Sequence, residues 1–287
     1  MNNYVILTDS ACDLTPDHLS KLGVKVLPLS FLVVSSGKEY LNYDIGSKEF
    51  YSMMRDGEVI KTSAINVSNF KDFFEAELKN GFDILYLGFS SGLSTTYNSA
   101  CIAADDLKEK YPDRKIICVD TLSASAGFGL LLNLTVEKKN SSATIEEAAE
   151  YAKSLIPNLC HWFTVDDLVY LKRGGRISPT VAFVGGLLGI KPILHMDDEG
   201  RLVNITKVRG RKASIEALAE KFGELGINKQ NPVWLCHADC EDDAKALSNI
   251  IKKKYGVTVG HIADIGPVIG AHAGPHTIAV FFIGNHR

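Results

Sequence analysis

The segment best equipped for chemistry is a serine-rich loop, which reads GFSSGLSTT over residues 88–96. Its first five residues match G-x-S-x-G, the strand–turn–helix pattern that presents the nucleophilic serine of many hydrolases. Ser90 would be that nucleophile, and Asp239 or Asp264 followed by His272 would complete a triad in the order that this pattern requires. One hypothesis is therefore a Ser-His-acid esterase that uses Ser90 and His272.

The same loop also fits a binding site, because it holds more hydroxyl groups than one nucleophile needs. Phe89 is bulky for a strained nucleophile turn, and no HGGG-type oxyanion segment precedes Ser90. Hydroxyl and backbone N–H groups at a helix start attract anions. Without a lysine in the loop or a G-x-x-x-x-G-K pattern, a single carboxylate is a better ligand than a nucleotide triphosphate. Ordinary helix N-capping by Ser91 or Ser94 is the alternative to a ligand site.

A second candidate segment reads GPVIGAHAGPH over residues 266–276 and frames His272 with glycine and proline. This composition predicts a rigid loop that presents one imidazole, which could donate a hydrogen bond to a carboxylate or bind a metal ion. The one local cluster of metal-ligating residue types is Cys236-His237-Ala238-Asp239-Cys240. No second cluster follows at zinc spacing, so we expect no metal site.

A third segment, LKRGGRI over residues 171–177, places Lys172, Arg173 and Arg176 around a glycine pair. Cations favour helix C-termini, so this cluster indicates either a solvated helix end or a docking patch for a phosphate or an acidic partner. The interleaved aromatic residues that are typical of nucleic-acid binding are absent.

The composition is that of a soluble globular protein, with 287 residues, 46% hydrophobic and 23% charged. A net charge of −3 gives no overall attraction to nucleic acid. The apolar stretches are too short to cross a bilayer, and the N-terminus has no signal-peptide pattern. We therefore expect a cytoplasmic protein without a transmembrane segment. The six cysteines are scattered, as buried free thiols are.

The elements that must position these segments alternate between strand and helix in the first half of the chain. This order predicts an α/β fold, with a mainly parallel sheet flanked by helices over residues 1–157 and a small excursion near 28–61. Consecutive strands with helices to one side predict an α+β domain over residues 158–287. Polar turns after strands ending at Leu7, Leu87 and Val119 should meet at one sheet edge, which Thr62 can also reach. Ser68 is the expected N-cap of the helix after Thr62.

Taken together, these segments resemble the DegV family of bacterial fatty-acid-binding proteins, the carrier subunits of fatty acid kinase. The resemblance runs from VILTDSACDL at residue 5 to TIAVFF at residue 282. It rests on four motifs in order: TSAIN (62–66), SSGLSTTY (90–97), LKRGGRIS (171–178) and GPVIGAHAGPH (266–276). The family implies two domains with a long-chain fatty acid between them, and the acyl chain in an apolar tunnel.

The resemblance also implies roles for individual residues. Thr62, Ser94 and His272 would hold the fatty-acid carboxylate, and the supporting loop residues would be Ser63, Ser91 and Gly92. The carrier itself would do no chemistry and need no cofactor. It would present the carboxylate to an ATP-dependent kinase subunit that makes an acyl phosphate, and Arg173 is associated with docking that subunit.

The sequence departs from the family pattern at some positions, and it leaves the oligomeric state and one alternative function open. The family commonly has glycine where Thr95 stands, and threonine where Ala271 and Ala273 stand, which bears on loop shape and on the acyl chain that fits. We expect a monomer. A lipid-sensing regulatory protein that acts without a kinase is the remaining alternative.

Overall fold

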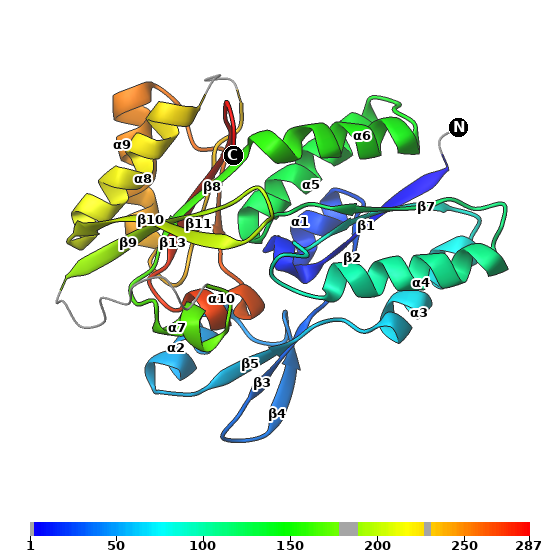
Figure 1. Cartoon of the computed structure of the whole chain (residues 1–287), viewed down its shortest axis with the longest axis horizontal. Helices are drawn as coiled ribbons and strands as arrows, with labels where there is room; N and C mark the ends of the chain where they lie inside the picture. Colours follow the sequence, from blue (N-terminus) through cyan, green and yellow to red (C-terminus); the bar gives the residue numbers. More distant parts are fainter. Residues whose placement is uncertain (1–2, 178–188, 227–230) are drawn as a thin grey trace.

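The computed structural model describes residues 3–177, 189–226 and 231–287 (Figure 1). Its first sheet has the order β2-β1-β6-β7, and all its pairings are parallel. The strands are β1 (Tyr4–Asp9), β2 (Lys25–Leu27), β6 (Asp83–Gly88) and β7 (Ile116–Asp120). Because they run in one direction, the polar turns after β1, β6 and β7 share one edge, as the sequence predicts.

Helices cover both faces of this first sheet. The pair α3 (Val67–Lys79) and α4 (Thr96–Lys110) packs together below the strands in Figure 1, and α5 (Ser125–Asn140) with α6 (Ile145–Leu155) lies above them. The short α1 (Pro16–Lys21) begins after Thr15, whose side chain accepts a hydrogen bond from the His18 N–H. The predicted cap of α3 is wrong: Asn66, not Ser68, precedes this helix and accepts from the Asn69 N–H at 2.9 Å. Two 3₁₀ turns span Ser10–Cys12 and Ile156–Asn158.

The predicted excursion is a small antiparallel sheet with the order β4-β3-β5. It consists of β3 (Ser30–Val33), β4 (Lys38–Leu41) and β5 (Ile60–Ser63), and α2 (Ser47–Arg55) connects the last two strands. Phe31 is fully buried and packs edge-on against Phe50 of α2, which anchors the small sheet to the core. The last strand, β5, carries Thr62 and Ser63.

The second large sheet has the order β10-β9-β8-β13-β11-β12, and all its pairings are antiparallel except that between β11 and β12. Its strands are β8 (Leu159–Thr164), β9 (Ile190–Met196), β10 (Leu202–Arg209), β11 (Trp234–His237), β12 (His261–Asp264) and β13 (Ile278–Ile283). Helices α8 (Arg211–Leu225) and α9 (Glu241–Tyr255) cover its outer face, and α5 of the first half touches its inner face (Figure 1). The predicted mixture of a parallel α/β part and a sheet-rich C-terminal part is confirmed.

Two short helices lie between the second sheet and the small sheet: α7 (Val169–Arg173) and α10 (Pro267–Ala273) (Figure 1). Buried apolar residues from the first sheet and from the inner face of the second form one continuous cluster, which includes Leu85, Phe128, Phe163 and Phe281. A separate cluster fills the space under α8 and α9. None of the described helices is long and apolar enough to cross a membrane.

Candidate ligand-binding site

A cavity lies where the carboxyl edge of the first sheet meets the inner face of the second. Its empty space, which includes open solvent at the mouth, is about 840 Å³. The residues around it are mostly apolar, and the larger of them include Phe89, Leu93, Phe163, Met196, Leu202 and Phe281. Such a lining suits a hydrophobic ligand of substantial length.

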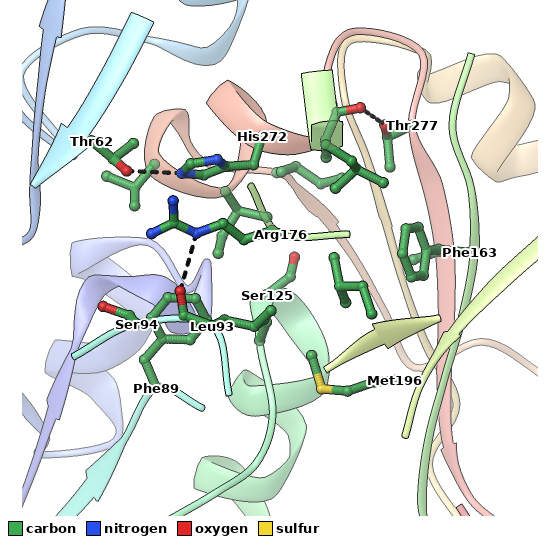
Figure 2. Close-up of a pocket in the computed structure, with 18 of the residues that line it drawn as sticks. Thr62, Phe89, Leu93, Ser94, Ser125, Phe163, Arg176, Met196, His272 and Thr277 are labelled. Carbon is green, nitrogen blue, oxygen red and sulfur yellow. Dashed lines mark hydrogen bonds between the residues drawn. The ribbon is translucent and has the colours of Figure 1, made fainter. Parts of the chain in front are cut away.

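Polar groups gather at one end of this cavity. The Thr62 hydroxyl and Nε2 of His272 are 2.8 Å apart, and Ser94 and Arg176 line the same end. Figure 2 shows these four side chains together, with Phe163 and Met196 on the far side. The cavity therefore has a polar end and an apolar end.

The position of His272 depends on how α10 begins. The sequence predicts a loop here, but His272 lies in the last turn of a helix, which starts at Pro267 and ends before Gly274 at φ +82°. Three side chains from the first half of the chain hold the helix start. Asp13 Oδ1 accepts from the Gly266 N–H at 3.0 Å, Asn42 Oδ1 accepts from the Val268 N–H at 3.0 Å, and the Tyr51 hydroxyl donates to the Ile265 carbonyl at 2.9 Å.

Ser94 is positioned by the buried hydroxyl of Thr96. Their oxygens are 2.9 Å apart, and Thr96 Oγ1 also accepts from the Ile65 N–H at 3.3 Å. Thr96 therefore connects the serine-rich loop to the chain that follows Thr62. Thr95 is exposed at φ −78°, a conformation open to any residue, so its side chain fits here without strain.

Charge at the polar end is unbalanced in favour of an anion. Burial, and then the nearby Arg176 guanidinium, lower the pKa of His272 to about 4, so the imidazole is neutral near pH 7. Arg176 donates from Nε to the Leu93 carbonyl at 3.1 Å and from Nη1 to the Gly174 carbonyl at 2.5 Å. Within the described ranges no carboxylate forms an ion pair with it. Since a part-buried cation without a counter-charge is costly, this end favours a negatively charged group.

Comparison with known proteins places the chain in a family. The model of "Uncharacterised protein, DegV family" matches residues 3–285. The chain belongs to the DegV family. A DegV domain-containing protein of Clostridium perfringens is 42% identical over 100% of this chain and 99% of the relative.

Solved structures of similar proteins share the whole fold. A structure from Thermus thermophilus, described as fatty acid binding of a DegV family protein, has a TM-score of 0.88 and 30% identity and covers 98% of this chain and 99% of its own. A stearic acid-binding protein from Eubacterium ventriosum has a TM-score of 0.88 and 27% identity and covers 98% of both chains.

The structure of this DegV protein brings together the three residues proposed for carboxylate binding, Thr62, Ser94 and His272. Ser63 lines the mouth and is exposed, whereas the other two supporting residues do not line the cavity. The Ser91 N–H donates to Asp120 Oδ1 at 3.2 Å, and Gly92 packs so closely on the turn between β9 and β10 that a Cβ would lie 2.6 Å from the Glu199 carbonyl oxygen.

The basic segment divides into two parts with different surroundings. Arg173 is exposed at the end of α7, with its guanidinium 5.8 Å from the Tyr170 ring. Arg176 turns back into the cavity wall, a position that the sequence analysis missed. The available signal was the glycine pair at 174–175, where φ of +69° at Gly175 reverses the chain.

Ser90, the serine of the hydrolase pattern, is held in place by hydrogen bonds to the backbone rather than by a catalytic base. Ser90 is fully buried, and its hydroxyl donates to the Gly200 carbonyl at 2.8 Å and accepts from the Gly92 N–H at 3.2 Å. A carbonyl oxygen cannot take the proton as a general base. The candidate acids are also engaged elsewhere, because Asp239 pairs with Arg55 at 2.5 Å and Asp264 accepts from Ser47 at 2.9 Å. In the described part of the chain, no three His, Cys, Asp or Glu side chains form a metal-binding group.

Proposed function

We propose that this DegV protein binds one long-chain fatty acid, with the acyl chain in the apolar cavity and the carboxylate at Thr62, Ser94 and His272. The observation that carries this proposal is the placement of those three groups at one end of a mostly apolar cavity, beside an arginine that pairs with no carboxylate among the described residues. Relatives of the same fold that are described as fatty-acid-binding support it.

The energetics of such a complex are favourable. Burying each methylene contributes ~0.8 kcal/mol, so a long chain gains roughly 10 kcal/mol before the costs of association. The carboxylate then needs hydrogen-bond donors, which the Thr62 and Ser94 hydroxyls, the His272 imidazole and the remaining N–H groups of Arg176 can supply. An anion beside His272 would raise its pKa again, because it stabilises the charged imidazolium.

The finer role follows from where the polar end lies. Ser63 and Ala64 line the cavity and are exposed, so the mouth is next to Thr62. A carboxylate bound there remains accessible to a second protein. The proposed partner is an ATP-dependent kinase subunit that converts the carboxylate to an acyl phosphate, and exposed Arg173 is the proposed docking residue. The chain itself contributes no catalytic residue.

The first test is mass spectrometry of the purified protein, followed by binding of stearate to a delipidated sample. We expect a co-purified fatty acid, and weaker stearate binding in Ser94→Ala and in His272→Ala. Ser90→Ala should bind stearate about as tightly as the wild type. Any ester hydrolysis by the sample should be the same in Ser90→Ala as in the wild type. If the purified protein contains no lipid and has an esterase activity that disappears in Ser90→Ala, the carrier hypothesis is wrong and the esterase hypothesis is supported.

The second test concerns the partner. Arg173→Ala should bind stearate like the wild type and be phosphorylated more slowly by a fatty acid kinase subunit. Lys252→Ala, at an exposed position of α9 outside this basic segment, is the control and should be phosphorylated like the wild type. Equal phosphorylation of all three proteins would refute the docking role. If no kinase subunit accepts the loaded wild-type protein, the lipid-sensing alternative gains support instead.

A further inference from the structure

Two cysteines meet in the layer between the first sheet and α4. Cys118 is the central residue of β7, an edge strand of that sheet, and Cys101 lies on α4, which packs against β7. The Tyr97 hydroxyl donates to the Cys118 carbonyl at 3.3 Å. Because Tyr97 and Cys101 are about one helical turn apart on the same face of α4, this bond brings the Cys101 side chain next to Cys118.

The two thiols are in hydrogen-bond contact with each other. That contact, and then the Tyr97 hydroxyl, lowers the pKa of the Cys101 thiol, while the same contact and burial raise the pKa of Cys118. In the four cysteines outside this pair, burial raises the pKa of the thiol. Cys101 is therefore the cysteine of this chain that most readily forms a thiolate, and a second thiol lies beside it.

This arrangement has the features of a redox-active pair. The thiolate is the form that attacks an oxidant, and accessible cysteines of low pKa that lie beside a second cysteine oxidise reversibly. Cys101 and Cys118 are both partly exposed, so a small oxidant can reach the pair. Cys240 is also partly exposed, but its sulfur contacts the Arg211 guanidinium and the Thr277 carbonyl, and burial raises its pKa to about 11.

We propose that Cys101 and Cys118 form a redox switch, in which a peroxide oxidises the two thiols to a disulfide and thereby weakens binding of the fatty-acid carboxylate. The Cys101 thiolate attacks the peroxide and becomes a sulfenic acid, while the second peroxide oxygen leaves as hydroxide. The Cys118 thiol then attacks the sulfenic sulfur, the S–S bond forms, and water leaves. The two thiols lose two electrons, which reduce one peroxide, and a dithiol reductant reverses the reaction.

The effect on the ligand follows from where α4 begins, and this part of the inference rests on the proposed function. Thr96 is the first residue of α4, and its hydroxyl positions Ser94. A disulfide holds its two sulfurs about 2 Å apart, which is closer than two thiols in hydrogen-bond contact. Forming it draws the first turns of α4 toward β7. We expect Ser94 to move with the helix start and to lose its alignment with Thr62 and His272.

The first test treats the reduced protein with hydrogen peroxide and identifies disulfide-linked peptides by mass spectrometry. In the wild type we expect a linkage between the peptides of Cys101 and Cys118, which disappears on reduction with dithiothreitol. Cys240→Ser is the matched control at the other partly exposed cysteine, and should form the same linkage. Cys118→Ser should instead stop at a sulfenic acid on Cys101, which dimedone traps.

The second test measures stearate binding to the delipidated protein before and after oxidation. The affinity of the wild type should fall severalfold after peroxide treatment and recover after dithiothreitol. Cys101→Ser controls for oxidation elsewhere, as of Met196 in the cavity wall, and its affinity should show no such fall.

The outcomes separate this inference from the proposed function. If peroxide produces no linkage between Cys101 and Cys118 in the wild type, the redox pair is wrong, and this result does not depend on the folding of any variant. If the linkage forms but the oxidised and reduced proteins bind stearate equally, the disulfide is not a switch. If the reduced protein binds no stearate, the proposed function is wrong, whether or not the linkage forms.

Discussion

The two large sheets contribute to the cavity in different ways. The first sheet acts through its edge, where the loop after β6 supplies Ser94 and the start of α5 supplies Ser125. The second sheet acts through its inner face, where alternate residues of β8 and β13, Phe163 and Phe281 among them, form the wall. The polar groups proposed for recognition therefore lie on loops and helix ends, whereas the apolar wall is a continuous packed surface.

This difference predicts that the wall matters most for folding. Phe281→Ala should lower the free energy of unfolding by about 3–5 kcal/mol, because Phe281 is 3% exposed and truncation leaves a void beside His161 and α5. Urea denaturation measures the effect. Ile205→Ala, at a half-exposed position of β10, should change it by less than about 0.5 kcal/mol. Equal effects at both positions would contradict the comparison.

The polar end should matter for the head group rather than for folding. His272→Ala should weaken stearate binding by about tenfold to a hundredfold, since hydrogen bonds to a charged group contribute about 1.5–3 kcal/mol. Binding of stearyl alcohol, which carries no charge, should fall much less. Met196→Leu, a volume-conserving change in the apolar wall, should alter both ligands alike. Isothermal titration with both ligands distinguishes these patterns.

Asp13 connects the start of α5 to the start of α10, and its contribution to the stability of the protein should depend on pH. This side chain accepts from Ser125 and from the Gly266 N–H, and burial raises its pKa from 3.8 to about 7. In the native state it keeps its proton over a range where the unfolded chain has lost it, so its contribution to stability is complete below pH 4 and is lost as the pH rises through 7.

Asp13→Asn removes this titration. The melting temperature of the wild type minus that of Asp13→Asn should therefore fall by a few degrees between pH 4 and pH 8. His272, whose lowered pKa has the opposite effect on stability, is present in both proteins and cancels in the difference. Thermal denaturation at several pH values measures it, and a pH-independent difference would show that Asp13 does not titrate in this range.

The smallest effect should come from displacing His272 without removing it. A Cβ on Gly174 would lie 2.1 Å from His272 Nδ1, while φ of −73° at Gly174 lets alanine fit the backbone. Gly174→Ala should weaken stearate binding severalfold and stearyl alcohol binding less. Gly46→Ala is the control, since it has the same φ and no atom within 4 Å of the new Cβ. If Gly174→Ala keeps the wild-type preference for stearate over stearyl alcohol, the His272 ring moves without losing its contact with the carboxylate.

Much of the fold could be predicted because its signals are local. The polar turns after β1, β6 and β7 and the small excursion that holds β3 and β4 lie where apolar runs alternate with turn residues, so both are predicted. The helix α10 was missed because Gly270 interrupts its apolar pattern, although Pro267 at its start and Gly274 after its end are helix signals. Asn66 and Ser68 are both good caps, and local propensity does not choose between them.

The candidate site was predicted unevenly for the same reason. The segments around Ser94 and His272 stand out from their surroundings, but the joint assignment of Thr62, Ser94 and His272 comes from the resemblance to the family. Arg176 lies in the cavity because the chain reverses after Gly175, and its charge pattern is the same as that of an exposed helix end. Phe163 and Phe281 are ordinary strand residues, and their place in the cavity wall depends on how β8 and β13 pair.

The hydrogen bond from Ser90 to Gly200 has a consequence for ligand exchange. It fastens the β9–β10 turn of the second sheet to the loop of the first, next to the close approach of Gly92 to the same turn. Separating the sheets would break the Ser90–Gly200 hydrogen bond and expose the backbone of the β9–β10 turn that packs against Gly92. We therefore expect a ligand to enter and leave end-on through the mouth beside Ser63, with its residence time set by the side chains there rather than by a hinge. Ser90, which resembles a nucleophile in the sequence, would then act on ligand exchange by keeping the two sheets together, so that the mouth is the route.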